Sequence, residues 1–81
     1  MRVEIYTKPD CPLCEEAKEQ VELAQDELGF ELVFHNILTQ ERWHAEFRYF
    51  VPVVFIDGVR VLELRFTSEQ LSSALKADRH E

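Results

Sequence analysis

The feature that most constrains this 81-residue chain is a long amphipathic pattern near its N-terminus. Apolar residues recur there at steps of three and four, the spacing of one face of an α-helix. They are Leu13, Ala17, Val21, Ala24 and Leu28. Pro12 suits the first helical position, and Gly29 is a natural helix terminator. The pattern predicts a helix that begins near Pro12 and ends before Gly29.

Strand-like segments lie on both sides of this helix. Val3 and Ile5 alternate with polar neighbours, and the segment Phe30 to Ile37 is rich in β-branched and aromatic residues. The helix between them is a connection too long for a hairpin, so it serves as a crossover. We therefore expect two parallel strands joined by a right-handed connection.

The second half of the chain predicts one further helix and then a hairpin. Thr39 can cap a helix that places Trp43, Phe47 and Phe50 on one face. Asp57-Gly58 then separates two apolar runs, Val53–Ile56 and Val59–Phe66, and supplies the positive φ angles of a type I′ turn. The first run is apolar on both faces and suits a central strand, and the second suits an edge strand.

The last predicted element is a helix with a capping box at its start. Thr67 and Gln70 have the spacing of that motif, and Leu71, Ala74 and Leu75 continue an amphipathic pattern. The expected order is βαβαββα, an α/β fold with a four-stranded mixed sheet flanked by helices. The chain is expected to form a single domain over residues 1–81.

Bulk properties exclude several classes of protein. The longest apolar run, Val51 to Ile56, is far too short to span a bilayer, and no secretion signal is visible at the N-terminus. The formal charge of −7 argues against a protein that binds nucleic acid. A single closely spaced cysteine pair differs from the cysteine frameworks of small secreted domains. We therefore expect a cytoplasmic protein, monomeric, with no membrane or nucleic-acid partner.

The negative charge is concentrated around the first helix, where Lys18 is the only basic residue. The carboxylates there are Asp10, Glu15, Glu16, Glu19, Glu22, Asp26, Glu27 and Glu31. A solvated helix face is the simpler interpretation and the one we favour. The alternative is a docking surface for a basic partner.

The two cysteines of the chain, Cys11 and Cys14, fall at the junction of the first strand and the first helix. Two thiols at this spacing can close a small disulfide, and the helix amides together with Lys8 favour a thiolate. Nearby carboxylates oppose the thiolate, but only weakly. We expect the two thiols to be exposed unequally, with Cys11 as the attacking thiol and Cys14 as the thiol that resolves the mixed disulfide.

Two other functions could use the same residues. A zinc or copper site could combine the cysteine pair with His35, His44 or His80, although the chain lacks a second spaced pair of ligands. No metal is therefore expected. A redox-inactive adaptor could present Trp43, Phe47, Tyr49 and Phe50 as an aromatic patch, although core packing is the simpler role for the helical members of this set.

Two segments resemble signatures of a known family. Tyr6-Thr7-Lys8-Pro9-Asp10-Cys11-Pro12-Leu13-Cys14 resembles the active-site segment of glutaredoxins in the thioredoxin superfamily. Val51-Pro52-Val53-Val54-Phe55-Ile56-Asp57-Gly58 resembles their second signature, and the similarity covers nearly the whole chain. The resemblance implies a thioredoxin/glutaredoxin fold and a thiol–disulfide oxidoreductase that needs no metal or organic cofactor. Leu13, in place of the usual aromatic residue, places the chain in a divergent branch.

The resemblance also implies roles for particular residues. In glutaredoxins the proline of the second signature is cis and packs against the cysteines, which implies that role for Pro52. The preceding residue, Val51, is implied to offer its backbone to the substrate. Lys8 matches a basic residue that helps to hold the glutathione carboxylate, and Pro12 and Leu13 fall among the implied substrate contacts.

The chain departs from the family after the hairpin. Glutaredoxins usually carry a Gly-Gly pair and then an acidic residue that binds glutathione, whereas this chain has Leu62-Glu63-Leu64-Arg65. Side chains at the glycine positions would obstruct the approach of glutathione. We therefore expect protein disulfides as substrates, and either glutathione or a thioredoxin-type reductase as electron donor.

Overall fold

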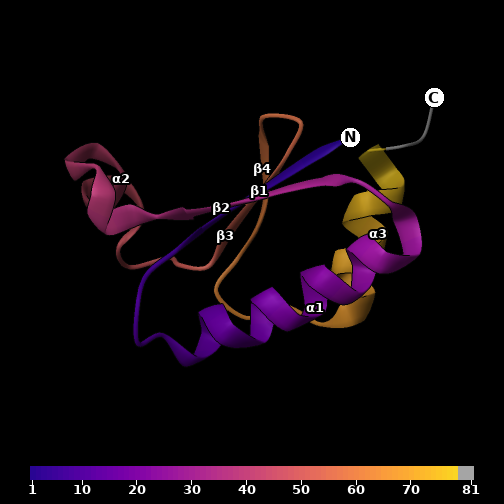
Figure 1. The fold of residues 1–81 in the computed structure, drawn as a ribbon, viewed down its shortest axis with the longest axis horizontal. Coiled ribbons are helices and arrows are strands. Elements are labelled where there is room, and N and C mark those ends of the chain that lie inside the picture. Colours follow the sequence, from indigo (N-terminus) through magenta and orange to yellow (C-terminus); the bar gives the residue numbers. More distant parts are fainter. Residues whose placement is uncertain (79–81) are drawn as a thin grey trace.

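The computed structural model describes residues 1–78 and shows the predicted order of elements (Figure 1). The first half contains β1 (Arg2–Thr7), α1 (Pro12–Leu28) and β2 (Glu31–Asn36). A short 3-10 helix, η1 (Ile37–Thr39), then leads into α2 (Glu41–Phe47). The second half contains β3 (Val53–Ile56), β4 (Val59–Glu63) and α3 (Ser68–Asp78). The α/β fold class is therefore confirmed.

The four strands form one mixed sheet in the order β2-β1-β3-β4. β1 and β2 are parallel, with Val3 opposite Leu32, as the helical crossover between them predicts. β3 pairs antiparallel with both β1 and β4. The prediction of β3 as a central strand and β4 as an edge strand is confirmed.

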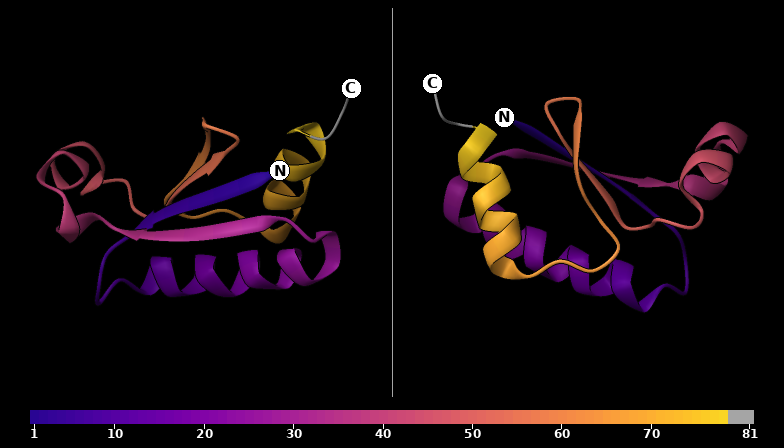
Figure 2. Two further views of the ribbon diagram at one scale, coloured as in Figure 1. Left: turned by 45° about the horizontal axis from the view of Figure 1, so that its top comes forward. Right: turned by 180° about the vertical axis from the view of Figure 1, so that it is seen from behind.

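Helices α1 and α3 pack against one face of the sheet (Figure 2). The core there joins Val3 and Ile5 of β1 to Val21 of α1 and Leu75 of α3, and none of these four side chains is accessible to solvent. Burial of this apolar surface is the main term that favours folding. It also fixes the position of α1, because Val21 lies in the middle of that helix.

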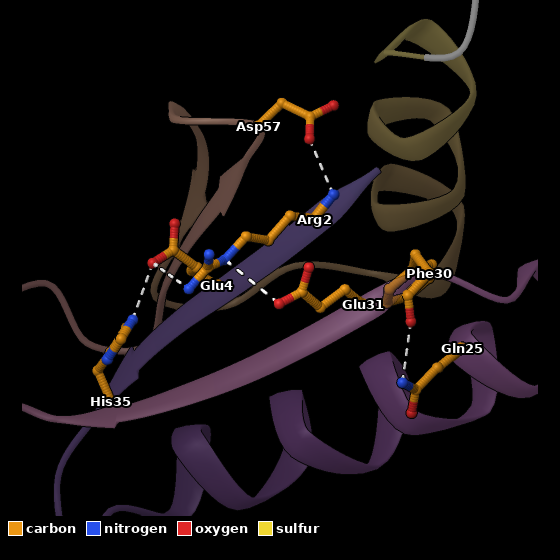
Figure 3. Close-up of polar contacts among 7 residues, drawn as sticks. All are labelled: Arg2, Glu4, Gln25, Phe30, Glu31, His35 and Asp57. Atoms are coloured by element: carbon orange, nitrogen blue, oxygen red, sulfur yellow. Dashed lines mark hydrogen bonds and ion pairs between the residues drawn. The ribbon is translucent and has the colours of Figure 1, made fainter.

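Both ends of α1 follow the sequence signals. Pro12 occupies the first turn, and Gly29 adopts a left-handed conformation with a φ of 68°. The Gly29 N–H donates to the Gln25 carbonyl at 2.8 Å, which closes the helix. The Gln25 side chain also donates to the Phe30 carbonyl at 3.0 Å and ties the end of α1 to the start of β2 (Figure 3).

The hairpin between β3 and β4 has the predicted turn, because Asp57 and Gly58 have φ values of 48° and 84°. Asp57 also joins the turn to β1, where its side chain accepts a hydrogen bond from the Arg2 N–H at 2.8 Å (Figure 3). The predicted strand Val59–Phe66 was too long, because β4 ends at Glu63. Leu64 has a φ of 60°, which is incompatible with an extended strand, and an irregularity opposite Val54 and Phe55 also interrupts the ladder.

The prediction that Thr39 caps the second helix was wrong. Thr39 ends η1, and its hydroxyl donates to the Asn36 carbonyl at 2.7 Å. α2 begins at Glu41, preceded by Gln40, which makes no side-chain capping bond. Because α2 ends at Phe47, Phe50 lies beyond the helix.

The capping box at the start of α3 is present with both of its hydrogen bonds. The Gln70 N–H donates to the Thr67 hydroxyl at 3.0 Å, and the Thr67 N–H donates to the Gln70 side chain at 2.8 Å. Leu71 and Leu75 of this helix are buried in the core. Within residues 1–78, no helix has the length and apolar character needed to cross a bilayer.

Candidate functional site

The two cysteines lie together at the N-terminal end of α1. Cys11 is the residue that caps the helix, in an extended conformation, and its sulfur accepts a hydrogen bond from the Cys14 N–H at 3.2 Å. Both residues are free thiols. The unpaired N–H groups of a helix N-terminus attract negative charge, and one of them points at the Cys11 sulfur.

Both thiols are largely buried, with 9% of Cys11 and 3% of Cys14 exposed. The sequence predicted unequal exposure, and Cys11 is the more exposed of the two. The difference is modest because both side chains pack in one apolar cluster with Ile37, Phe47 and Val51. Cys11 is therefore the more accessible residue of the pair.

The environment of Cys14 keeps its thiol protonated. Burial raises the pKa of the Cys14 thiol to about 12, and its hydrogen bond to Cys11 acts in the same direction. A hydrogen bond from the Lys8 backbone N–H partly opposes this rise in pKa. At neutral pH Cys14 is consequently a protonated thiol that can donate a hydrogen bond to its neighbour.

The loop before Cys11 holds this arrangement with an uncommon backbone conformation. Asp10, the residue next to Cys11, has a φ of 57°. Aspartate tolerates this left-handed region better than most residues because its short side chain can hydrogen-bond locally. The Lys8 side chain is exposed, while its backbone contacts Cys14. Lys8 therefore acts on the site through its backbone as well as through its charge.

The segment Val51-Pro52 forms the second wall of the site. Pro52 is buried and its peptide bond with Val51 is cis, as the resemblance to glutaredoxins implied. Val51 packs in the same cluster as Cys11 and Cys14. The structure thus brings together the cysteine pair and the start of β3, which lie about 40 residues apart in the sequence.

Hydrogen bonds hold this wall from two sides. The Val51 N–H donates to the Phe47 carbonyl at 3.1 Å, which links it to the end of α2. The Leu64 N–H lies 3.2 Å from the Phe50 carbonyl and 2.9 Å from the Pro52 carbonyl. The Val51 N–H is therefore already engaged inside the protein. Leu64 makes these contacts from a left-handed backbone conformation that favours glycine.

Two further predicted contact residues, Pro12 and Leu13, lie at the start of α1, and the two residues that replace the glycine pair of glutaredoxins lie in β4. Pro12 is exposed at the start of α1, and Leu13 is half-buried against the cysteine cluster. Leu62 packs partly into the main core. Glu63 is exposed and forms an ion pair with Arg60 at 2.7 Å. Leu62 and Glu63 stand where glutaredoxins usually carry glycine, so each adds a side chain near the end of β4.

An aromatic cluster around Tyr6 packs next to the cysteine site. This cluster was not predicted from the sequence. The Tyr6 ring lies 4.7 Å from His35, 5.3 Å from Trp43 and 4.6 Å from Phe47, measured between ring centroids. Alternation along β1 and β2 could have indicated the pair, because Tyr6 lies opposite His35 in the register. Trp43 and Phe47 join from α2, whose position no sequence pattern specifies.

The two histidines that the structure describes, His35 and His44, do not form a metal site with the cysteines. His35 contacts Glu4 at 2.9 Å rather than a cysteine (Figure 3), and His44 is exposed on α2. In the part of the chain that the structure describes, no three His, Cys, Asp or Glu side chains are grouped in a way that could hold a metal ion. His80, the third histidine considered as a ligand, lies outside the described residues. Of the aromatic residues proposed as an adaptor surface, Phe47 is buried and Tyr49 is exposed.

A four-stranded mixed sheet with a paired cysteine motif at the start of α1 and a cis-proline opposite defines a thioredoxin-fold protein. Within that class, residues 2–76 match the profile of the glutaredoxin-like domain family (DUF836). The chain belongs to this family.

Solved structures share the fold. A structural-genomics target protein from X. campestris is 28% identical, with a TM-score of 0.78 over 93% of this chain and 96% of its own. A protein from Nitrosomonas europaea is 24% identical, with a TM-score of 0.75 over 90% of this chain and 88% of its own. Glutaredoxin from E. coli shares the fold, with a TM-score of 0.64 at 17% identity over 96% of each chain.

Proposed function

We propose that the protein is a thiol–disulfide oxidoreductase that acts through Cys11 and Cys14. The observation that carries this proposal is the 3.2 Å contact between the Cys14 N–H and the Cys11 sulfur at the start of α1. In this contact the Cys11 sulfur, the proposed nucleophile, lies at the helix terminus against the backbone of Cys14, its proposed partner. Membership of the glutaredoxin-like family supports the proposal.

The proposed reaction has two exchange steps. The Cys11 thiolate attacks one sulfur of a substrate disulfide, so that a Cys11–substrate bond forms, the substrate S–S bond breaks, and the departing sulfur takes up a proton. Cys14 then loses its proton and attacks the Cys11 sulfur. This second step forms the Cys11–Cys14 disulfide and releases the other substrate thiol. The substrate gains two electrons and the protein loses two.

The raised pKa of Cys14 suits this order of events. In the reduced protein, burial and the hydrogen bond to Cys11 keep Cys14 protonated. Once Cys11 is bonded to a substrate, it no longer accepts that hydrogen bond or carries a charge, whereas the Lys8 N–H remains in place. The pKa of Cys14 would then fall, and its thiolate would form when it is needed.

The surroundings of the wall favour a protein disulfide as substrate. Because the Val51 N–H is engaged with Phe47, a substrate backbone would meet the Val51 carbonyl oxygen rather than its N–H. The exposed side chains of Glu63 and Leu64 occupy the end of β4, where a small peptide such as glutathione would need space. Lys8 and Pro12 are exposed at the opposite rim and could contact a larger partner.

Electrons would return to the Cys11–Cys14 disulfide from a second thiol system. We propose a thioredoxin-type reductase rather than glutathione as the donor. Comparing the rates at which each system reduces the oxidised protein tests this proposal. Efficient reduction by glutathione alone would contradict it while leaving the dithiol reaction intact.

Reduction of the interchain disulfides of insulin, with dithiothreitol in excess, tests the function itself. We expect the protein to accelerate insulin precipitation and Cys11→Ser to abolish the acceleration. Cys14→Ser should lose most of it, because the mixed disulfide would then depend on external thiol for release. Full activity in Cys11→Ser would contradict the proposed nucleophile, and full activity in Cys14→Ser would indicate a route that uses one thiol.

A further inference from the structure

A groove of about 480 Å³ lies between α1 and α3, near the C-terminal half of α1. Figure 1 and Figure 2 show the two helices side by side in this region. The apolar part of its lining comes from both helices: Leu23, Ala24 and Leu28 of α1, and Leu71 and Leu75 of α3. The inward sides of Leu71 and Leu75 belong to the core, so the groove has a firm apolar floor.

Leu23 is the most accessible apolar side chain of this lining, with 69% of its surface exposed. It also borders a second hollow of about 390 Å³, which it shares with Glu19, Glu22 and Asp26. The Leu23 side chain therefore forms a ridge between two depressions. A leucine so exposed contributes little to the stability of the fold, and its apolar surface remains available to a partner.

Carboxylates surround this apolar surface. Asp26 and Glu27 line the groove, and Glu19 and Glu22 line the adjoining hollow. All four are exposed, and within residues 1–78 none of them forms an ion pair. Lys18, the one basic residue of α1, lies over the Phe34 ring of β2 at 5.9 Å from its centroid. Negative charge near the groove is thus left without a cationic partner on α1.

We propose that this groove binds a basic amphipathic helix of a partner protein. An apolar side chain of that helix would enter the groove beside Leu23, and lysine or arginine residues one turn away would face the carboxylates. Helices commonly dock in apolar grooves through anchors spaced three or four residues apart. Complementary charge at the rim speeds association and sets specificity, and it makes binding sensitive to salt.

This surface is separate from the cysteine site. Ala24 lies ten residues after Cys14 on the same helix, or about 15 Å along the helix axis. A partner docked at the groove would leave the Cys11 sulfur accessible. The proposal therefore goes beyond the redox function and does not depend on it.

A peptide titration followed by NMR of the full-length, isotope-labelled protein tests the inference. The probe is a synthetic helical peptide of lysine and leucine with all of its leucines on one face. We expect backbone signals of Leu23, Ala24, Leu28, Leu71 and Leu75 to shift on titration. A second peptide, with serine in place of leucine and the same charge, should bind about tenfold more weakly or not at all.

Two exposed leucines provide matched variants. Leu23→Lys should weaken binding of the lysine–leucine peptide by about tenfold or more. Leu38→Lys makes the same change of charge in η1, at a leucine that is 59% exposed, and should leave binding unchanged. Insulin reduction should be unaffected by Leu23→Lys.

Several results would overturn the inference. Equal binding of the serine peptide would show that the attraction is only diffuse charge, and an equal loss in both lysine variants would mean the same. Signal changes confined to Cys11 and Val51 would place the peptide at the redox site. Absence of any shift at millimolar peptide would show that the groove does not bind such a helix.

Discussion

At the scale of single residues, Cys11 and Cys14 have different environments although they are three positions apart. Cys11 caps α1 and accepts the Cys14 N–H, whereas Cys14 is more deeply buried and keeps its proton. The proposed exchange uses this asymmetry, because Cys11 attacks the substrate first and Cys14 resolves the mixed disulfide afterwards. The assignment of Cys11 as attacking thiol and Cys14 as resolving thiol follows from their places at the helix start and stays a prediction.

The raised pKa of Cys14 has a consequence for stability at high pH. The unfolded thiol loses its proton near its ordinary pKa of 9.0, while the folded protein retains that proton up to about pH 12. Between these values the folded state binds more protons, so the free energy of unfolding should fall as pH rises. Denaturant unfolding of the reduced protein and of Cys14→Ser across this range measures the effect. The fall should be steeper in the parent protein, and parallel curves would contradict the assignment.

Leu64 has a left-handed backbone conformation, and its N–H donates to the Pro52 carbonyl. A residue with a Cβ atom pays roughly 1–2 kcal/mol in this conformation, and glycine does not. Leu64→Ala retains this cost, so Leu64→Gly should be the more stable of the two variants by about 1 kcal/mol. Chemical denaturation of the pair gives the difference. If the alanine variant were equally stable, the backbone at Leu64 would not be strained.

At the scale of elements, local capping signals predicted helix ends well only where the chain had no competing turn. Gly29 and the pair Thr67 and Gln70 lie at the ends that their patterns indicate. Thr39 does not cap α2, because its hydroxyl donates a hydrogen bond to the Asn36 carbonyl and η1 lies between β2 and α2. β4 is shorter than its alternating pattern suggests, since alternation says nothing about the φ of Leu64.

The capping box of α3 provides a test at this scale. Thr67→Ala removes the acceptor for the Gln70 N–H, and it should cost about 1 kcal/mol of unfolding free energy. Ser68→Ala, one residue along at an exposed position, is the matched control and should cost under about 0.5 kcal/mol. Thermal or urea denaturation compares them. Similar costs at the two positions would show that the hydrogen bond contributes nothing specific.

At the scale of the whole molecule, α1 contributes to both the cysteine site and the groove beside α3. Its first turn holds the cysteines, its buried side packs on the sheet, and its C-terminal half borders the groove. The parallel pairing of β1 and β2 could be predicted because the long helix α1 between them suits a crossover connection and is far too long for a hairpin. The groove could not be predicted, because it depends on how α3 lies against α1. The aromatic cluster at Tyr6 escaped prediction for the same reason, since it depends on the placement of α2.

The charge of the molecule predicts how salt affects its stability. Six carboxylates and one lysine lie on α1, and the net charge is −7. These groups repel one another at low ionic strength, and the screening length falls from about 30 Å at 0.01 M to about 10 Å at 0.1 M salt. The melting temperature should therefore rise over this range of sodium chloride. A constant or falling melting temperature would show that repulsion along α1 is unimportant.

The most direct test of the central claim identifies the cysteine that carries the substrate. Reduced Cys14→Ser is mixed with a disulfide-bonded protein such as insulin, and the trapped adduct is digested and examined by mass spectrometry. We predict a mixed disulfide at Cys11 in this variant, and a much slower reaction at Cys14 in Cys11→Ser. Adduct formation at equal rates in the two variants, or at neither cysteine, would contradict the account.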